Sequence, residues 1–236
     1  MNLNSEIITM LNNENCNLVG FADLRCLPNE ARQDINGKIF DYGIIIALSF
    51  TKEAMVENID NLPQKYFAEY EQTNKRLTEL SKLTAQLLAE KGYETLLNST
   101  SIYKDRSEWR TFLPHKTVAT LAGVGWIGKC AMLVTNEVGA ALRLDVILTN
   151  APLNCGIPIT KSFCPPNCTI CVDICPNNAP TGGLWDVDVD RDEFFDVHAC
   201  TKAALNRAKS LLDIEYPLCG LCMSSCPFTK KGLEYK

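Results

Sequence analysis

Residues 164–176 read Cys164-Pro165-Pro166-Asn167-Cys168-Thr169-Ile170-Cys171-Val172-Asp173-Ile174-Cys175-Pro176, a run with four cysteines that ends in a Cys-Pro pair. The segment Cys219-Gly220-Leu221-Cys222-Met223-Ser224-Ser225-Cys226-Pro227 repeats its closing spacing, Cys-x2-Cys-x3-Cys-Pro. Cys200 lies between the two segments, so eight of the 12 cysteines fall between Cys164 and Cys226. In a cytosolic protein, cysteines grouped in this way are more often metal ligands than disulfide partners. The two segments therefore predict a metal-binding region.

The spacing of these cysteines is typical of bacterial ferredoxins, although the gap between Cys164 and Cys168 has three residues where ferredoxins have two. In two-cluster ferredoxins the cysteine before the proline binds the other cluster. Applied here, this rule gives the first [4Fe–4S] cluster the ligands Cys164, Cys168, Cys171 and Cys226. The second cluster then takes Cys175, Cys200, Cys219 and Cys222. All eight cysteines are used in this assignment.

Two other roles for the eight cysteines stay open. Two zinc sites with four thiolates each could use the same residues, but the repeated ending is not a zinc-ribbon spacing. A disulfide framework conflicts with the cytoplasmic location that we expect, because residues 1–16 lack the basic and apolar regions of a signal peptide. The longest apolar run, residues 43–50, is too short to span a membrane. The pattern favours iron–sulfur clusters.

The remaining four cysteines are scattered along the chain. We expect Cys16 and Cys26 to be buried as small apolar residues, as unpaired cysteine often is. Cys155 has no feature that marks it for chemistry. Cys130 directly follows a glycine-rich loop, and both a packing role and a place near a cofactor stay open for it.

The first 150 residues have the pattern of an α/β fold, and residues 151–236 change to a Pro-, Cys- and Asn-rich composition with little periodicity. We therefore expect an α/β domain over 1–150 and a small cluster-binding domain over 151–236. Strands are predicted at 18–24, 42–50 and 93–98, and helices at 5–11, 62–88 and 116–122. A hairpin is predicted from 132–135 and 141–148. The net charge of −5 gives no help in binding nucleic acid.

The loop Gly123-Val124-Gly125-Trp126-Ile127-Gly128-Lys129, followed by Leu142-x4-Ile147-Leu148-Thr149-Asn150 and the two Cys-Pro segments, resembles the epoxyqueuosine reductases. That family is cobalamin-dependent, carries two [4Fe–4S] clusters, and is related to reductive dehalogenases. The resemblance is good over residues 114–228 and loose over the first hundred. It implies an α/β (α+β), nitroreductase-like corrinoid-binding domain followed by a bacterial-ferredoxin-like domain. It also implies cobalamin contacts from Gly123, Gly125, Trp126, Ile127, Gly128 and Lys129.

Two departures from the family limit what the resemblance implies. Arg110 stands where the family has an acidic proton donor, so Tyr103, Asp105 and Glu108 become the candidate donors. The chain also ends soon after its last cysteine, which resembles a short form without the family's C-terminal helical-repeat region. With the negative charge, this makes tRNA a doubtful substrate.

The sequence predicts an iron–sulfur oxidoreductase in which the clusters pass electrons to cobalamin for a reductive reaction. We expect a redox donor such as ferredoxin or flavodoxin, a small-molecule or nucleoside-like substrate, and no membrane partner. The alternative is an electron-transfer protein or corrinoid reductant with no substrate of its own. A cluster protein that senses oxygen is the third class considered.

Overall fold

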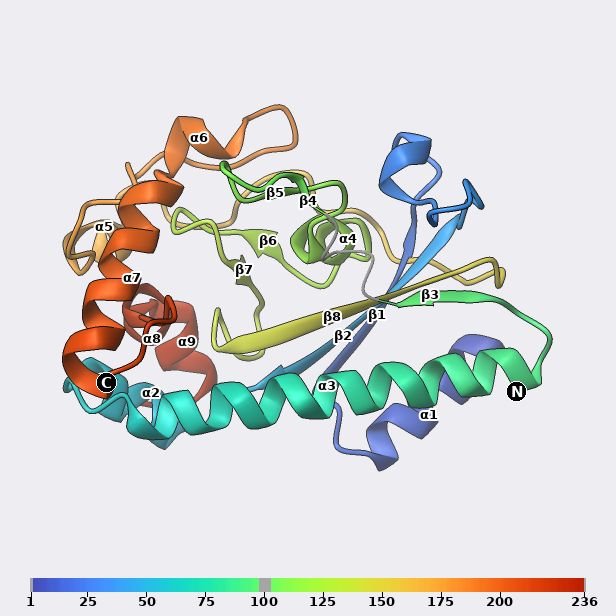
Figure 1. The fold of residues 1–236 in the computed structure, drawn as a ribbon, viewed down its shortest axis with the longest axis horizontal. Coiled ribbons are helices and arrows are strands. Elements are labelled where there is room, and N and C mark those ends of the chain that lie inside the picture. Colours follow the sequence, from blue (N-terminus) through green and yellow to red (C-terminus); the bar gives the residue numbers. More distant parts are fainter. Residues whose placement is uncertain (1, 98–102, 236) are drawn as a thin grey trace. The chain divides into compact units, whose positions relative to one another are not determined.

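The computed structural model describes residues 2–97 and 103–235, which form two compact units (Figure 1). Unit 1 contains Met1–Leu48, Thr73–Val124 and Arg143–Ile159, and unit 2 contains Ser49–Gln72, Gly125–Leu142 and Thr160–Lys236. The division expected at residue 150 stays a prediction about domains. The compact units are discontinuous, because two segments from the first 150 residues belong with the cysteine-rich part of the chain.

Unit 1 is built on a four-stranded sheet whose order is β1-β2-β8-β3. The strands are β1 (Leu18–Asp23), β2 (Tyr42–Ser49), β8 (Leu142–Thr149) and β3 (Thr95–Leu97). β1 pairs antiparallel with β2, and β3 pairs antiparallel with β8. The strands expected at 18–24 and 42–50 are therefore present as β1 and β2. The strand expected at 93–98 is present as the half-buried β3, with residue 98 outside the described residues.

Two helices of unit 1 share a core with the sheet. They are α1 (Leu3–Asn13) and the part of α3 (Gln64–Glu90) that lies beyond residue 72. The core joins apolar side chains from these helices to side chains of three strands: Ile7, Leu11, Phe21, Ile44, Ile46, Leu77, Leu80, Leu88 and Ile147. The single long helix expected at 62–88 is confirmed, because its apolar residues recur at helical spacing.

Helix α4 (His115–Leu121) packs against β1. Glycines on two strands allow the helix to lie close to the sheet: a Cβ on Gly20 of β1 would lie 3.1 Å from Ala122 Cβ, and one on Gly43 of β2 would lie 2.9 Å from Val118 Cγ1. Unit 1 also contains the short hairpin of β4 (Tyr103–Asp105) and β5 (Arg110–Thr111). The helix expected at 116–122 is confirmed within one residue of each end.

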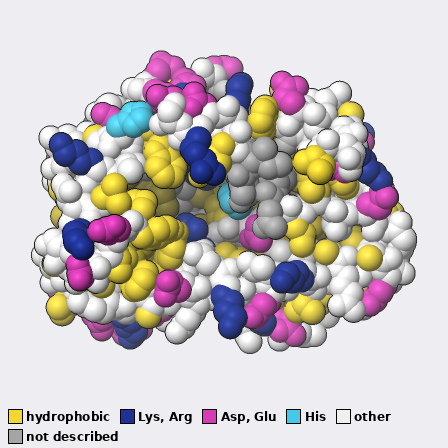
Figure 2. Space-filling view, viewed as in Figure 1, with side chains coloured by type: hydrophobic (Ala, Val, Ile, Leu, Met, Phe, Trp, Pro, Cys, Tyr) yellow, Lys and Arg dark blue, Asp and Glu magenta, His cyan; other side chains and the backbone are white. Residues whose placement is uncertain are grey.

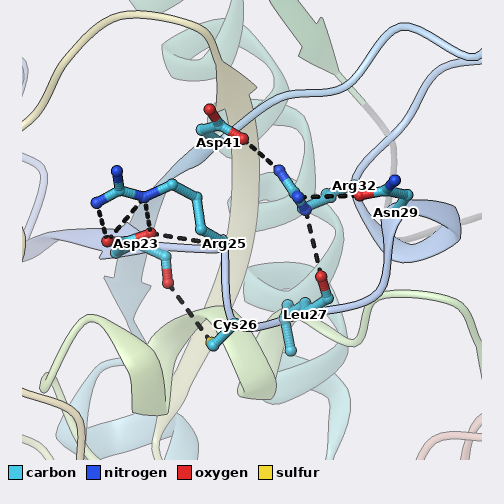
Figure 3. A network of polar contacts seen from close by, with 7 residues as sticks. All are labelled: Asp23, Arg25, Cys26, Leu27, Asn29, Arg32 and Asp41. Atoms are coloured by element: carbon cyan, nitrogen blue, oxygen red, sulfur yellow. Dashed lines mark hydrogen bonds and ion pairs between the residues drawn. The ribbon is translucent and has the colours of Figure 1, made fainter.

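A polar network holds the loop that follows β1 in unit 1 (Figure 3). Arg25 Nη2 and Nε donate to the Asp23 carboxylate at 2.6 and 2.9 Å, and this ion pair lowers the pKa of Asp23 to about 2. Arg32 binds Asp41 and also donates to the Leu27 carbonyl and the Asn29 side chain. The network surrounds the short 3-10 helix η1 (Asn29–Ala31).

The expected burial of Cys26 is wrong, because this residue lies exposed in the same loop. Its sulfur is 3.9 Å from the Asp23 carbonyl oxygen, among charged side chains (Figure 3). The expectation for Cys16 is confirmed, since it is 7% exposed in the core of unit 1.

The regular secondary structure of unit 2 is mainly helical. Its helices are α2 (Lys52–Ile59), α5 (Ile170–Asp173), α6 (Arg191–Phe194), α7 (Val197–Leu212), α8 (Leu221–Ser225) and α9 (Pro227–Gly232). The buried Asn58 side chain on α2 contacts α8 and α7, because Asn58 Nδ2 donates to Ser224 Oγ and Arg207 Nη2 donates to Asn58 Oδ1. Among residues 2–97 and 103–235, no helix is both long enough and apolar enough to cross a bilayer.

The hairpin expected from residues 132–135 and 141–148 forms only as a turn closed by an isolated antiparallel bridge between Thr135 and Gly139. Instead β7 (Leu133–Val134) pairs antiparallel with β6 (Trp126–Ile127), and β8 joins the sheet of unit 1. The chain between β7 and β8 is held elsewhere: Ala140 N donates to Thr229 Oγ1 at 2.9 Å, and Gly139 lies against the backbone of α9. This contact with α9 takes the place of the expected strand pairing.

Replacing Gly139 by alanine should destabilise unit 2. Gly139 has a φ of 60°, and a Cβ there would lie 2.1 Å from Thr229 N and 2.5 Å from Phe228 C, both backbone atoms of α9. The matched control is Gly37→Ala, because Gly37 also has positive φ but no atom within 4 Å of its Cβ position. We expect Gly139→Ala to lower the free energy of unfolding by about 1–3 kcal/mol more than Gly37→Ala in urea denaturation. Equal losses would contradict the contact.

Candidate metal centre

A cavity in unit 2 is lined by cysteines from both segments. Its lining includes Cys164, Cys168 and Cys171 of the first segment, Cys222 and Cys226 of the second, and Cys130. The remaining wall is largely apolar, with Val134, Pro165, Pro227 and Phe228. Figure 2 shows hydrophobic side chains, a class that includes cysteine in this view, gathered at the left of the picture. The fold therefore brings two distant cysteine segments around one space.

Short helices position the cysteines of the second segment. Cys219 precedes Gly220, which begins α8 with a φ of 71°, and Cys222 lies within α8. Cys226 occupies the N-cap position of α9, with Pro227 as the first helical residue, where proline is tolerated. α8 packs against α5, the helix that contains Cys171. The Cys-Pro pair thus ends one helix and starts the next while it turns Cys226 toward the cavity.

Two of the thiols have a pKa that is raised in part by the charge of other cysteines, which must therefore lie close to them. Burial is the main cause of the raised pKa of Cys226, and the nearby Cys164 and Cys171 raise it further. Burial likewise raises the pKa of Cys219, with a further contribution from Cys175. Both pairings cross between the two segments in the manner of the interleaved assignment. The assignment of all eight ligands, Cys168 and Cys200 included, stays a prediction.

Cys130 belongs to the same cluster of thiols, a place that the sequence left open. It is 5% exposed, and its side chain forms hydrogen bonds with Cys171 and Cys222. The bond with Cys171 lowers the pKa of Cys130, but the bond with Cys222 and complete burial raise it well above its ordinary value. The cysteine-rich segments alone gave no sign of this neighbour, because Cys130 precedes them by more than thirty residues.

The glycine-rich loop contacts the chain itself. A Cβ on Gly123 would lie 2.4 Å from Ile157 O, and one on Gly125 would lie 2.4 Å from Val134 O. A Cβ on Gly128 would lie 2.8 Å from Val134 Cγ2 and 3.5 Å from Cys164 Sγ. The cobalamin contacts implied for Gly123, Gly125, Trp126, Ile127, Gly128 and Lys129 stay a prediction. The contacts described for the glycines are with protein backbone and side chains.

Lys129 and Trp126 support the first cysteine segment. Lys129 is 3% exposed, and its Nζ donates to Pro166 O at 2.7 Å and to Cys168 O at 2.9 Å. The Trp126 ring packs edge-on against Phe163, which precedes Cys164, and against Phe228. The sequence indicated both residues as contacts of a cofactor, a role that stays a prediction. Their roles here could be seen only once the segment around residues 163–168 was placed beside the loop.

The three candidate proton donors lie in or next to the β4–β5 hairpin of unit 1. Tyr103 packs edge-on against Trp109, and Arg106 lies over the Tyr103 ring at 4.9 Å. Asp105 is exposed, and the hydrogen bonds that it accepts from Ser107 and from Glu108 N lower its pKa. Asp105 is therefore ionised at neutral pH and is a poor proton donor. The role of Tyr103, Asp105 or Glu108 in catalysis stays a prediction.

The residues present fit iron–sulfur clusters by their chemistry. All eight predicted ligands are cysteines, and Ala179 N donates to Cys175 Sγ at 3.3 Å, the kind of amide–sulfur bond that tunes clusters. Trp126 Nε1 is a buried donor without an acceptor among the described residues. Within residues 2–97 and 103–235, no three His, Cys, Asp or Glu side chains converge on a position for a single ion.

Sequence comparison relates the chain to a group of reductases. Epoxyqueuosine reductase of Atelocyanobacterium thalassa is 27% identical over 214 residues, which cover 89% of this chain and 66% of that protein. The same enzyme of Bacillus anthracis is 31% identical over 131 residues, which cover 52% of this chain and 31% of that protein. By sequence, the chain is similar to epoxyqueuosine reductases over half of its length or more. No family model matches it.

Solved structures show the same mixed α/β fold. An epoxyqueuosine reductase in complex with an epoxyqueuosine-modified tRNA-Tyr stem loop has a TM-score of 0.60 at 18% identity, covering 97% of this chain and 65% of that one. A reductive dehalogenase has a TM-score of 0.66 at 18% identity, covering 97% of this chain and 32% of that one. The chain thus spans 66% of the Atelocyanobacterium thalassa protein and 31% of the Bacillus anthracis protein.

Removing the Lys129 amino group should loosen the first cysteine segment. Lys129→Met keeps the apolar length of the side chain but leaves two carbonyl oxygens without their donor. We expect a loss of about 1–3 kcal/mol in the free energy of unfolding of the metal-free protein. Lys75→Met, at an exposed position, is the control and should change little. Equal stability of the two variants would show that the Lys129 bonds do not hold the segment.

The metal-free protein should lose stability as the pH rises above about 8.5, the ordinary thiol pKa. Burial raises the pKa of Cys219 and Cys226 in the folded chain. Above pH 8.5 the unfolded chain therefore loses protons that the folded chain keeps, and unfolding becomes more favourable. Urea denaturation under reducing conditions between pH 7 and about 10 measures this slope. The slope should flatten in the double variant Cys219→Ala/Cys226→Ala, and a slope of opposite sign in the parent would contradict the prediction.

Proposed function

We propose that the chain is an iron–sulfur oxidoreductase that passes electrons through two [4Fe–4S] clusters to a bound cobalamin for a reductive reaction. The observation that carries this proposal is the proximity of Cys226, in the second segment, to Cys164 and Cys171 in the first. Such crossing between segments is the arrangement of two-cluster ferredoxins. It brings the ligands of both clusters close together, which favours electron transfer between them.

The relatives support the reductive part of the proposal. The curated relatives described above are named epoxyqueuosine reductases, and the dehalogenase structure is described in terms of B12-dependent dehalogenation. The glycines of the loop pack on the chain's own atoms and therefore give no support for cobalamin. The support for cobalamin comes from these relatives. An electron donor such as ferredoxin or flavodoxin and a small-molecule or nucleoside-like substrate belong to the same proposal. The net charge of −5 argues against tRNA.

The chain's own residues would prepare the site for the clusters in three ways. Cys164, Cys168, Cys171 and Cys226 would bind the first cluster, and the other four predicted ligands the second. Val134 and Phe228 would keep water from the sulfurs, since they form part of the cavity wall. Lys129 would hold the backbone of the first segment through Pro166 O and Cys168 O. Bound clusters would supply one-electron transfer at low potential.

An electron-transfer protein without a substrate of its own is the second candidate. Two observations favour it. Arg110 stands where the family has its acidic proton donor, and the nearby Asp105 is ionised and so has no proton to donate. Such a protein would still need both clusters, so the two candidates share the metal centre. They differ in whether the chain binds a corrinoid and turns over a substrate.

The interleaved assignment can be tested by removing single ligands. After anaerobic reconstitution, the parent chain should bind about eight irons, the sum for two [4Fe–4S] clusters. Cys164→Ala and Cys226→Ala should lose the same cluster, as judged by iron content and electron paramagnetic resonance. Cys175→Ala and Cys219→Ala should lose the other one. If Cys226→Ala instead gave the spectrum of Cys219→Ala, the clusters would be sequential rather than interleaved, and the assignment would fail.

Titration of the reconstituted protein with cob(II)alamin distinguishes the two candidate functions. A base-off cobalt signal that saturates at one equivalent would support the corrinoid reductase. The control is the protein without clusters, which shows whether corrinoid binding needs them. Eight irons with an unchanged cobalt spectrum would overturn the cobalamin part of the proposal and leave the electron carrier.

A further inference from the structure

Cys130 is a ninth cysteine held within the predicted cluster site of unit 2. It follows β6 in a tight turn, where Gly128 N donates to Met132 O at 2.9 Å and Ala131 N donates to Gly128 O at 2.8 Å. Lys129, the residue before it, is fixed to the first cysteine segment by two hydrogen bonds. The position of Cys130 is therefore set by backbone on both sides.

The neighbours of Cys130 come from both predicted ligand sets. It lines the cavity together with Cys171, a predicted ligand of the first cluster, and Cys222, a predicted ligand of the second. Without a metal, Cys171 donates to Cys130, which donates to Cys222, and Cys130 is 5% exposed. A Cys171 that binds iron is a thiolate without a proton, so it can only accept from Cys130. The interleaved assignment already gives each cluster four cysteines, so Cys130 has no iron to bind.

We propose that Cys130 is a positioning residue that donates its S–H to the cluster-ligating sulfurs of Cys171 and Cys222 and so raises the reduction potential of the clusters. This inference rests on the iron–sulfur part of the proposed function and is independent of cobalamin. The thiol has one proton, so it serves one of the two sulfurs at a time.

The direction of the effect follows from charge. Reduction adds an electron to a cluster whose thiolates already make it negative, and hydrogen bonds to the sulfurs are one of the factors that set its potential. A donor to a charged acceptor binds more strongly than a neutral pair, so the S–H stabilises the reduced state more than the oxidised one. The site is buried, where such a bond is stronger than in water. Loss of the S–H should therefore lower the potential.

Redox titration of the whole reconstituted chain, followed by electron paramagnetic resonance, tests this role. Cys130→Ala should keep about eight irons, because the eight ligands are intact. At least one cluster should become about tenfold harder to reduce, which is ~59 mV for a one-electron couple. Cys130→Ser keeps a donor and should stay close to the parent. Cys16→Ala removes a buried thiol of unit 1 and is the matched control, with no change expected.

Each other outcome decides against the inference or against its basis. Unchanged potentials in Cys130→Ala at full iron content would reduce Cys130 to packing. Loss of about four irons would make it a cluster ligand instead of a hydrogen-bond donor. If the parent chain itself bound no iron, the proposed function would fail first. If Cys130→Ala does not fold, the parent chain provides the test. A thiol that donates to a cluster sulfur gives a magnetic coupling to the cluster that disappears in heavy water, and absence of such a coupling overturns the donor role.

Discussion

The proximity of Cys226 to Cys164 and Cys171 is the constraint on which unit 2 depends. Two thiol segments distant in sequence have to meet, and each is held from outside. Lys129 fixes the backbone of the first segment, while the contact of Gly139 and Ala140 with Thr229 fixes the helix that begins at Cys226. The segment 125–142 thus supports both sides of the cavity. In this sense the glycine-rich loop and its continuation are a scaffold for sulfur ligands.

Much of unit 1 could be predicted because its strands and its long helix carry clear apolar patterns. The errors come from interactions that a single segment does not contain. Helix α7 was missed because its buried residues are Ala203, Ala204 and Ala208, which give a weak apolar signal. The pairing of β7 was misjudged because alternation predicts a strand but not its partner, and β6 lies closer. Helix α2, with Asn58 buried, had the same lack of an apolar stripe.

The candidate site, too, could be predicted only in part from the sequence. The cysteine spacing is local, so the eight predicted ligands could be named from the sequence, and the proximities of Cys226 and Cys219 agree with it. The surroundings of Cys130 and the partners of Lys129 lie in segments that follow them by thirty residues or more, and no local pattern gives them. The resemblance of the loop to a cofactor-binding motif pointed to the right residues, while their described contacts are with the protein.

The discontinuity of unit 2 bears on how the protein is made in the cell. Its segments 49–72 and 125–142 leave the ribosome well before the cysteines at 164–226. The supporting segments are therefore synthesised before the predicted ligands, and Cys226 is the last of these ligands to be made. The predicted ligand set of the first cluster is therefore complete only once Cys226 has been made. For the same reason, a fragment limited to residues 160–236 lacks the walls that shield the sulfurs, and its thiols would be open to oxygen.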